Sequence, residues 1–297
     1  MSNVNEKLYI GIDGGGSKCK AVLTDSGINL LGEGLGGPAN PFYGLERTLN
    51  SIVDASTQAL ESANLPGKKL SDLVVGMGLA GVNLPELYKQ ITDWKHPFAK
   101  LYLTTDVDIA NIGAHSGKDG GVIIVGTGSI GFASIKGKQR MLGGHGFPIG
   151  DVASGAWIGL RAIEHAILAD EDFEEKGELA TKICKFYDVH NGLGLSEKLI
   201  GKASSEYARI ASIVFEASDN GDKAAEKIIN AGMAYIQQLA AKLFDDESER
   251  LAMIGGLTQF YMPRLPKEVA SLFSETLAQP EIGAVHLAMH REEKDNA

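Results

Sequence analysis

The sequence has 297 residues, enough for two domains of ordinary size, each with its own core. Hydrophobic residues make up 44% and charged residues 22%, a composition typical of a soluble globular protein. The 28 Lys and Arg against 38 Asp and Glu give a net charge of −10, which disfavours nucleic acid or an anionic membrane as a partner. No apolar run approaches the roughly 18 to 20 residues that span a bilayer, and residues 1–7 lack the features of a signal peptide. We therefore expect a cytoplasmic protein.

The chain opens with an apolar run, residues 8–12, followed by an acid and three consecutive glycines. Three glycines allow positive φ and the close approach of a ligand, and their N–H groups can converge on an anion. The Walker A motif G-x-x-x-x-G-K-[ST] is absent here. A dinucleotide-binding loop does not fit either, because the β-branched run after the glycines predicts a strand where that loop would open a helix. The sequence favours a hairpin closed over phosphate, the alternative being a glycine-rich hairpin without a ligand. The residues expected to hold phosphate are Gly14, Gly15, Gly16, Ser17 and Lys18.

Two carboxylates follow predicted strands. Asp13 ends the first apolar run, where a lone buried carboxylate is costly unless it serves a metal or a hydrogen-bond network. A Mg²⁺ ion bound to a nucleotide would account for it. Residues 101–105 predict another strand, which ends at Asp106. Because ligands bind beyond the carboxyl ends of strands in open α/β sheets, we expect Asp13 and Asp106 to face one crevice. Alternatively, Asp106 caps a helix predicted over 107–114.

The segment between these carboxylates alternates strands and helices. Residues 28–32 predict a third strand that runs into a glycine- and proline-rich loop ending at Asn40. Asn-Pro commonly starts a turn, so Asn40 is either a turn residue or an amide that binds a ligand hydroxyl. Helical spacing of apolar residues predicts a helix over 44–63, and residues 73–81 predict a buried strand.

The second half of the chain repeats this design. Residues 121–137 again place a glycine and hydroxyl turn between two strands, and residues 139–144 supply a third strand. A strand over 250–254 leads into a further glycine turn. Such a repeat suggests two related domains, which we place at 1–113 and 114–297, facing each other across a cleft. The residues of the two later turns are Gly126, Thr127, Gly128, Ser129, Gly255 and Gly256.

The motifs D-G-G-G-S, T-T-D, G-T-G-S and I-G-G-L, in this order, resemble those of the sugar kinase, heat-shock chaperone and actin superfold. Within it the chain resembles the BadF/BadG/BcrA/BcrD ATPase family, in its N-acetylglucosamine kinase and bacterial glucosamine kinase branch. Residues 143–155 look like the amino-sugar kinase loop G-G-x-G-x-x-x-G-D-x-x-S-G. The resemblance implies an α/β protein of two ribonuclease H-like, actin-like ATPase domains with ATP and sugar bound in the cleft between them. A C-terminal helix, about 282–293, would pack back onto the first domain.

The resemblance also implies a reaction, the transfer of the ATP γ-phosphoryl group to the 6-hydroxyl of an amino sugar. Asp13 would position hydrated Mg²⁺, and Asp106 would accept the hydroxyl proton. We favour N-acetylglucosamine, because residues 80–82 could form a small apolar recess for its acetyl group. The alternatives are glucosamine, or a BadF-type ATPase or nucleotide-dependent sensor without a sugar substrate. Gly255 and Gly256 would border the adenosine. The residues implied in orienting the sugar are Asn40, Asp106, Gly128, Gly144, His145 and Asp151.

Cysteine usage separates the branches of this family. Cys19 and Cys184 lie far apart and in no C-x-x-C pair, which argues against a disulfide framework, a structural zinc site or an iron–sulfur site. The radical-dehydratase activators and the zinc-containing ROK sugar kinases are therefore disfavoured. Two-domain kinases of this size often dimerise, so a homodimer is compatible with the resemblance.

Overall fold

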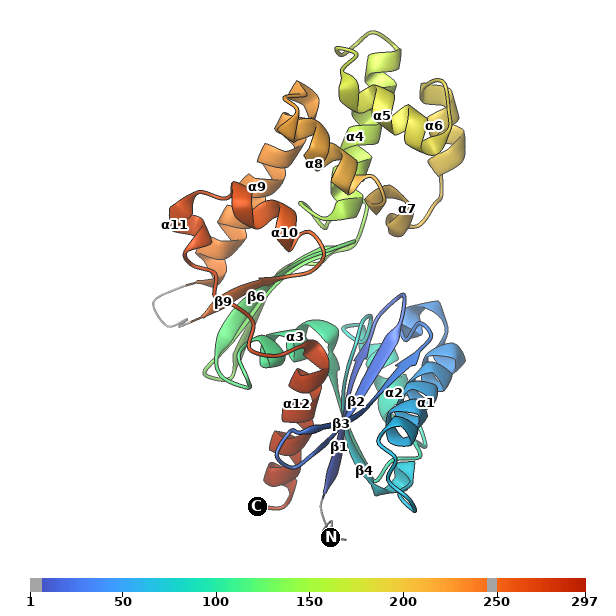
Figure 1. Cartoon of the computed structure of the whole chain (residues 1–297), viewed down its shortest axis with the longest axis vertical. Coiled ribbons are helices and arrows are strands. Elements are labelled where there is room, and N and C mark those ends of the chain that lie inside the picture. Colours follow the sequence, from blue (N-terminus) through green and yellow to red (C-terminus); the bar gives the residue numbers. More distant parts are fainter. Residues whose placement is uncertain (1–6, 245–249) are drawn as a thin grey trace. The chain divides into compact units, whose positions relative to one another are not determined.

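The computed structural model describes residues 7–244 and 250–297. Most of the segment in which no signal peptide is expected, residues 1–6, lies outside the described residues. The described chain divides into two compact units, unit 1 with residues 7–119 and 275–297 and unit 2 with residues 120–244 and 250–274 (Figure 1). The boundary expected after residue 113 lies inside α3 (Asp106–Ala114). The turn after this helix stays with unit 1, because the Gly117 N–H donates to the Ile112 carbonyl at 2.8 Å.

Unit 1 is built on a five-stranded sheet in the order β3-β2-β1-β4-β5. The first three strands form an antiparallel meander, and β4 and β5 continue the sheet parallel to β1. The register aligns Gly14 with Leu79, and Leu79 with Thr105, so the ends of the three parallel strands form one edge. The strands are β1 (Leu8–Gly14), β2 (Cys19–Asp25), β3 (Leu30–Gly36), β4 (Leu73–Leu79) and β5 (Lys100–Thr105).

Helices cover both faces of this sheet (Figure 1). Ile10 and Ile12 of β1 join the apolar cluster under α1. Tyr9, which points to the opposite face of the pleated strand, joins a cluster with Val285 of α12. With both faces covered, β1 carries an almost continuous apolar run. The helices of unit 1 are η1 (Pro41–Tyr43), α1 (Leu45–Ser62), η2 (Leu70–Asp72), α2 (Pro85–Thr92), α3 (Asp106–Ala114) and α12 (Pro280–Asp295).

The C-terminal helix α12 lies directly on the backbone of the sheet. A Cβ atom on Gly11 would overlap the carbonyl oxygen of Glu281, and one on Gly76 would overlap that of Ala284. The Glu281 carboxylate is buried and forms an ion pair with Lys20 of β2 at 2.6 Å. The last segment of the chain therefore completes unit 1, although it follows unit 2 in the sequence.

Unit 2 repeats the topology on a four-stranded sheet in the order β8-β7-β6-β9. Its first three strands are an antiparallel meander and β9 runs parallel to β6, as β4 runs parallel to β1 in unit 1. This confirms the internal repeat expected from the sequence. The strands are β6 (Gly120–Val125), β7 (Ser129–Ile135), β8 (Lys138–Gly143) and β9 (Leu251–Ile254).

Unit 2 has one large apolar core. Ile123 of β6, Ile158 of α4 and Ile236 of α9 belong to the same buried cluster. Among the described residues, no helix is both long and apolar enough to cross a bilayer. The helices are α4 (Gly155–Asp170), α5 (Glu178–Tyr187), α6 (Gly192–Leu199), α7 (Ser204–Ala208), α8 (Ala211–Asp219), α9 (Lys223–Leu243), α10 (Thr258–Tyr261), η3 (Met262–Arg264) and α11 (Lys267–Ala270).

Candidate active site

The first glycine turn joins β1 to β2 in unit 1. Two neighbouring loops are fastened to it, because Ala39 N–H donates to the Gly15 carbonyl and Ala80 N–H to the Gly14 carbonyl, both at 2.8 Å. Gly14 has no room for a side chain, since a Cβ would come within 3.0 Å of Ala39 Cβ. The tip of the turn, residues 16–18, is exposed. This arrangement leaves the N–H groups of the tip and the Lys18 ammonium group available to an anion.

Asp13, the residue before this turn, is held in a surrounding that disfavours its charge. Burial, followed by the charges of Asp106 and Glu281, raises its pKa from 3.8 to about 6, although Lys18 and Lys20 lower it. A carboxylate in such a place gains from a cation. Within residues 7–244 and 250–297 no group of three or more His, Cys, Asp or Glu side chains could hold a metal ion. A Mg²⁺ ion that takes most of its ligands from water and nucleotide phosphates fits this donor set.

Asp106 is the first residue of α3. Thr105, and not Asp106, is the N-cap, because its Oγ1 accepts a hydrogen bond from the Asp108 N–H at 3.2 Å. The capping role considered for Asp106 is therefore wrong, and its Oδ1 accepts from the Val107 N–H at 2.9 Å instead. Burial raises the pKa of Asp106, although backbone hydrogen bonds oppose the shift. A buried carboxylate with a raised pKa is a suitable proton acceptor.

Asn40 lies in the second loop fastened to the turn. Its Oδ1 caps η1 by accepting from the Phe42 N–H at 3.0 Å, whereas its Nδ2 donates to no group in the described part of the chain. Gly81 packs against this amide, so a Cβ there would lie 2.5 Å from Asn40 Oδ1. Of residues 80–82, where a recess is expected, Val82 is buried, whereas Ala80 and Gly81 are partly exposed. Phe42 and Tyr43, which follow Asn40 in η1, form an exposed edge-to-face pair.

The second glycine turn joins β6 to β7 in unit 2. It supports the start of α4, because the Gly155 N–H donates to the Gly126 carbonyl at 2.8 Å and the Ala156 N–H to that of Thr127 at 3.2 Å. The Ser129 hydroxyl is buried and donates to the Val152 carbonyl at 2.7 Å. The side chain of Ser129 therefore fixes the neighbouring loop, and Thr127 is the exposed hydroxyl of this turn.

The loop after β8 lies on this second turn. Gly144 N–H donates to the Ser129 carbonyl at 3.1 Å, and the Asp151 carboxylate accepts from the Ser129 N–H and, at 3.2 Å, from the Gly146 N–H. A Cβ on Gly128 would lie 2.8 Å from Asp151 Oδ2. Burial raises the pKa of Asp151, and the backbone hydrogen bonds and His145 oppose it. Gly128, Gly144 and Asp151 are thus brought together in unit 2, with the exposed His145 beside them.

The third glycine turn follows β9. The Leu257 N–H donates to the Val125 carbonyl at 3.1 Å, which places this turn beside the end of β6. Gly255 has a φ of +107° and its missing side chain lets Val125 pack against it, whereas a Cβ on Gly256 would meet nothing within 4 Å. Gly256 therefore offers a bare, open stretch of backbone against which a flat ring could lie.

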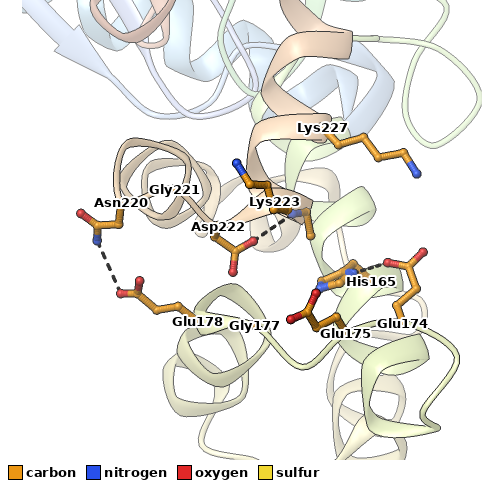
Figure 2. Close-up of a pocket in the computed structure, with 11 residues that line it drawn as sticks. His165, Glu174, Glu175, Gly177, Glu178, Asn220, Gly221, Asp222, Lys223 and Lys227 are labelled. Atoms are coloured by element: carbon orange, nitrogen blue, oxygen red, sulfur yellow. Dashed lines mark hydrogen bonds and ion pairs between the residues drawn. The ribbon is translucent and has the colours of Figure 1, made fainter.

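A separate polar cavity of about 520 Å³ lies among the helices of unit 2 (Figure 2). Several of its charged side chains cap a helix or pair with one another. Asp222 caps α9 by accepting from the Ala224 and Ala225 N–H groups at 3.0 Å, and His165 pairs with Glu174. None of the site residues expected from the sequence lines it.

The model of the BadF/BadG/BcrA/BcrD ATPase family matches residues 10–288. The chain belongs to this family. Membership implies the use of ATP.

Relatives of this family member are sugar kinases. The chain is 31% identical to the glucosamine kinase GspK of Vibrio cholerae over 95% of its own length and 94% of that protein. It is 28% identical to the N-acetylmuramic acid/N-acetylglucosamine kinase of Clostridium acetobutylicum, over 75% of this chain and 74% of that one. The crystal structure of a candidate N-acetylglucosamine kinase from Chromobacterium violaceum superposes with a TM-score of 0.88 at 28% identity, over 95% of this chain and 99% of that one. The fold is that of the actin-like ATPases, as expected from the sequence.

Proposed function

We propose that the protein is an ATP-dependent kinase that phosphorylates the 6-hydroxyl group of an amino sugar. The observation that carries the proposal is the pair Asp13 and Asp106, two carboxylates with raised pKa values at the same edge of the unit 1 sheet. Binding of a nucleotide needs an acid for the cation, but it does not need a second one that can accept a proton. Two such groups favour phosphoryl transfer to a hydroxyl.

Residues of each unit have proposed roles in this reaction. Asp106 takes the proton from the 6-hydroxyl as its oxygen bonds to the γ-phosphorus, and the bond from phosphorus to the β-phosphate oxygen breaks to release ADP. The turns at residues 14–18 and 126–128 hold phosphate oxygens, with Lys18 as a counter-charge. When bound, Mg²⁺ would neutralise phosphate charge, and Asp13 would hold it through its water ligands. Asn40 and Asp151 would orient the sugar, and Gly255 and Gly256 would border the adenosine.

Two amino sugars are candidates for the acceptor. Glucosamine is supported by the 31% identity to the Vibrio cholerae enzyme and by the carboxylates, which favour a cationic amine. N-acetylglucosamine is supported by the exposed pair Phe42 and Tyr43 next to Asn40, because an acetyl group gains from apolar contact. The partly exposed Ala80 and Gly81 remain candidates for a recess that would receive the acetyl group.

The proposal is tested by ADP release from Mg-ATP in the presence of glucosamine, N-acetylglucosamine, N-acetylmannosamine, glucose or no sugar. Strong stimulation by one amino sugar supports the kinase and identifies the acceptor. Turnover that is indifferent to every sugar would instead favour an ATPase that drives a partner protein. Binding of ATP without turnover would favour a nucleotide-dependent sensor.

A further inference from the structure

Tyr235 belongs to none of the motifs described above, yet its side chain reaches the candidate sugar loop. It lies on α9, and a Cβ added to Gly143 would come 2.7 Å from its hydroxyl oxygen. Gly143 has a φ of +75° and ends β8, so this glycine both turns the chain and admits the phenol. The hydroxyl therefore lies at the start of the loop that carries Gly144 and Asp151.

The surroundings of this hydroxyl are the polar groups of the second glycine turn and the sugar loop. The Cβ position of Gly143 that faces the Tyr235 hydroxyl is also 3.7 Å from the Ser129 carbonyl, which accepts from Gly144. Burial, and then the charge of Asp151, raise the pKa of Tyr235. A phenol with the ordinary pKa of 10.0 already keeps its proton at neutral pH, so Tyr235 can act as a donor.

Within residues 7–244 and 250–297, Tyr235 differs from the other partly or fully buried tyrosines because its hydroxyl donates to no protein oxygen. The sequence contains eight tyrosines, all of them in the described residues. The hydroxyls of six donate to protein oxygens: Tyr9, Tyr88, Tyr102, Tyr187, Tyr207 and Tyr261. Of the remaining two, Tyr43 is 69% exposed and needs no protein partner, whereas Tyr235 is partly buried and packs against the core. A partly buried phenol that has no hydrogen-bond partner among the described residues is suited to donate its hydrogen bond to an oxygen of a ligand.

We propose that the Tyr235 hydroxyl donates a hydrogen bond to a hydroxyl oxygen of the bound sugar. The inference rests on the proposed kinase function and adds a sugar-binding residue to it. Asp151 can only accept hydrogen bonds when ionised, while a sugar hydroxyl both donates and accepts. A neutral donor near this carboxylate lets the two side chains bind adjacent hydroxyls of the hexose. Gly143 is then required because any side chain there would displace the phenol.

The first test compares the Tyr235→Phe variant with the wild-type enzyme on the amino sugar that stimulates ADP release most. We expect the KM for the sugar to rise by about fivefold to tenfold, the size of one lost neutral hydrogen bond, while the KM for ATP stays unchanged. Tyr187→Phe is the matched control, because its hydroxyl donates to the Glu206 carbonyl at 2.8 Å elsewhere in unit 2. We expect the control to lower the melting temperature and to leave both KM values as in the wild type.

The second test uses 3-deoxy and 4-deoxy analogues of the same sugar. If Tyr235 donates to one of these hydroxyls, the analogue without it binds Tyr235→Phe and wild type equally, and the other analogue keeps the difference. A structural role of Tyr235 would lower affinity for every analogue alike. An increase in the KM for ATP alone would assign the hydroxyl to a phosphate and overturn the proposal, as would unchanged KM values for sugar and ATP. A wild-type enzyme without sugar-dependent turnover would overturn the kinase function and this inference with it, whereas the other outcomes leave the kinase function standing.

Discussion

Asp13 on β1 and Asp106 on α3 lie close enough in unit 1 for the charge of Asp106 to raise the pKa of Asp13. The parallel register of β1, β4 and β5 produces this proximity, because it brings the ends of β1 and β5 to one edge of the sheet. Two like charges near each other are unfavourable in the protein alone. A cation held by Asp13 would relieve that repulsion.

The Asp13→Asn variant is expected to be more stable than the wild type at pH 8 in the absence of nucleotide. Because folding raises the pKa of Asp13 from 3.8 to about 6, its stabilising contribution is present below pH 3.8 and is lost as the pH rises through 6. Removing the charge should raise the free energy of unfolding at pH 8 by about 1 to 3 kcal/mol and change little at pH 4. Thermal unfolding at both pH values measures this.

The control is Asp54→Asn on the exposed surface of α1. We expect it to change the free energy of unfolding by less than about 0.5 kcal/mol at either pH. Mg-ATP should stabilise the wild type and not Asp13→Asn, since the carboxylate would no longer hold the ion. Equal stability of Asp13→Asn and wild type at pH 8 would contradict an unfavourable buried charge on Asp13.

The Asp106→Asn variant is expected to lose catalysis while keeping the nucleotide. An amide cannot accept the proton of the sugar hydroxyl, so kcat should fall by about 10²- to 10⁴-fold. Binding of ATP, measured by calorimetry, should remain within about threefold of the wild type, because Asp106 is assigned no contact with the nucleotide. Full sugar-dependent ADP release by this variant would disprove the role of Asp106.

The Gly76→Ala variant is expected to destabilise unit 1 strongly. A methyl group there would lie 1.9 Å from the Ala284 carbonyl oxygen of α12, and this backbone group cannot move aside as a flexible side chain could. We expect a loss of about 3 kcal/mol or more in the free energy of unfolding, measured by denaturant titration. Gly16→Ala is the matched control, because a Cβ there meets nothing within 4 Å and no positive φ is required. A loss of the same size in both variants would contradict the close packing of α12.

The Phe42→Ala variant is expected to change sugar preference. If the acetyl group contacts the exposed Phe42 ring, loss of the ring should lower kcat/KM for N-acetylglucosamine by about fivefold. The value of kcat/KM for glucosamine should stay unchanged. Leu30→Ala is the control, since Leu30 on β3 is similarly exposed, at 55%, and has no assigned role. Parallel losses for both sugars would show that Phe42 shapes the loop around Asn40 rather than the choice of acceptor.

Local signals predicted the strands and turns on which the candidate site residues lie. Glycine turns after apolar runs placed residues 13–18 and 126–129 at strand ends, and the family expected from these motifs is confirmed by the match over residues 10–288. The relatives of this chain include sugar kinases, as expected. These features could be predicted because each turn needs its glycines within a few residues of the strand that it follows.

Features that depend on contacts between distant residues could not be predicted. The periodicity of α9 marks Tyr235 as a core residue, and only the folded chain shows that its hydroxyl meets Gly143. Likewise, Ser129 resembles a phosphate ligand in the motif, but its hydroxyl is committed to Val152. Thr105 rather than Asp106 caps α3, because the last strand residue already has the extended backbone that a cap requires.

The packing of α12 on Gly11 and Gly76 has a consequence for synthesis on the ribosome. Unit 2 is finished when residue 274 has emerged, whereas the face of the unit 1 sheet that carries Tyr9, Val22 and Val74 waits for Val285 and Ala288. The sheet of unit 1 is therefore completed only after unit 2 has been translated, and one of its apolar faces stays uncovered until α12 has emerged.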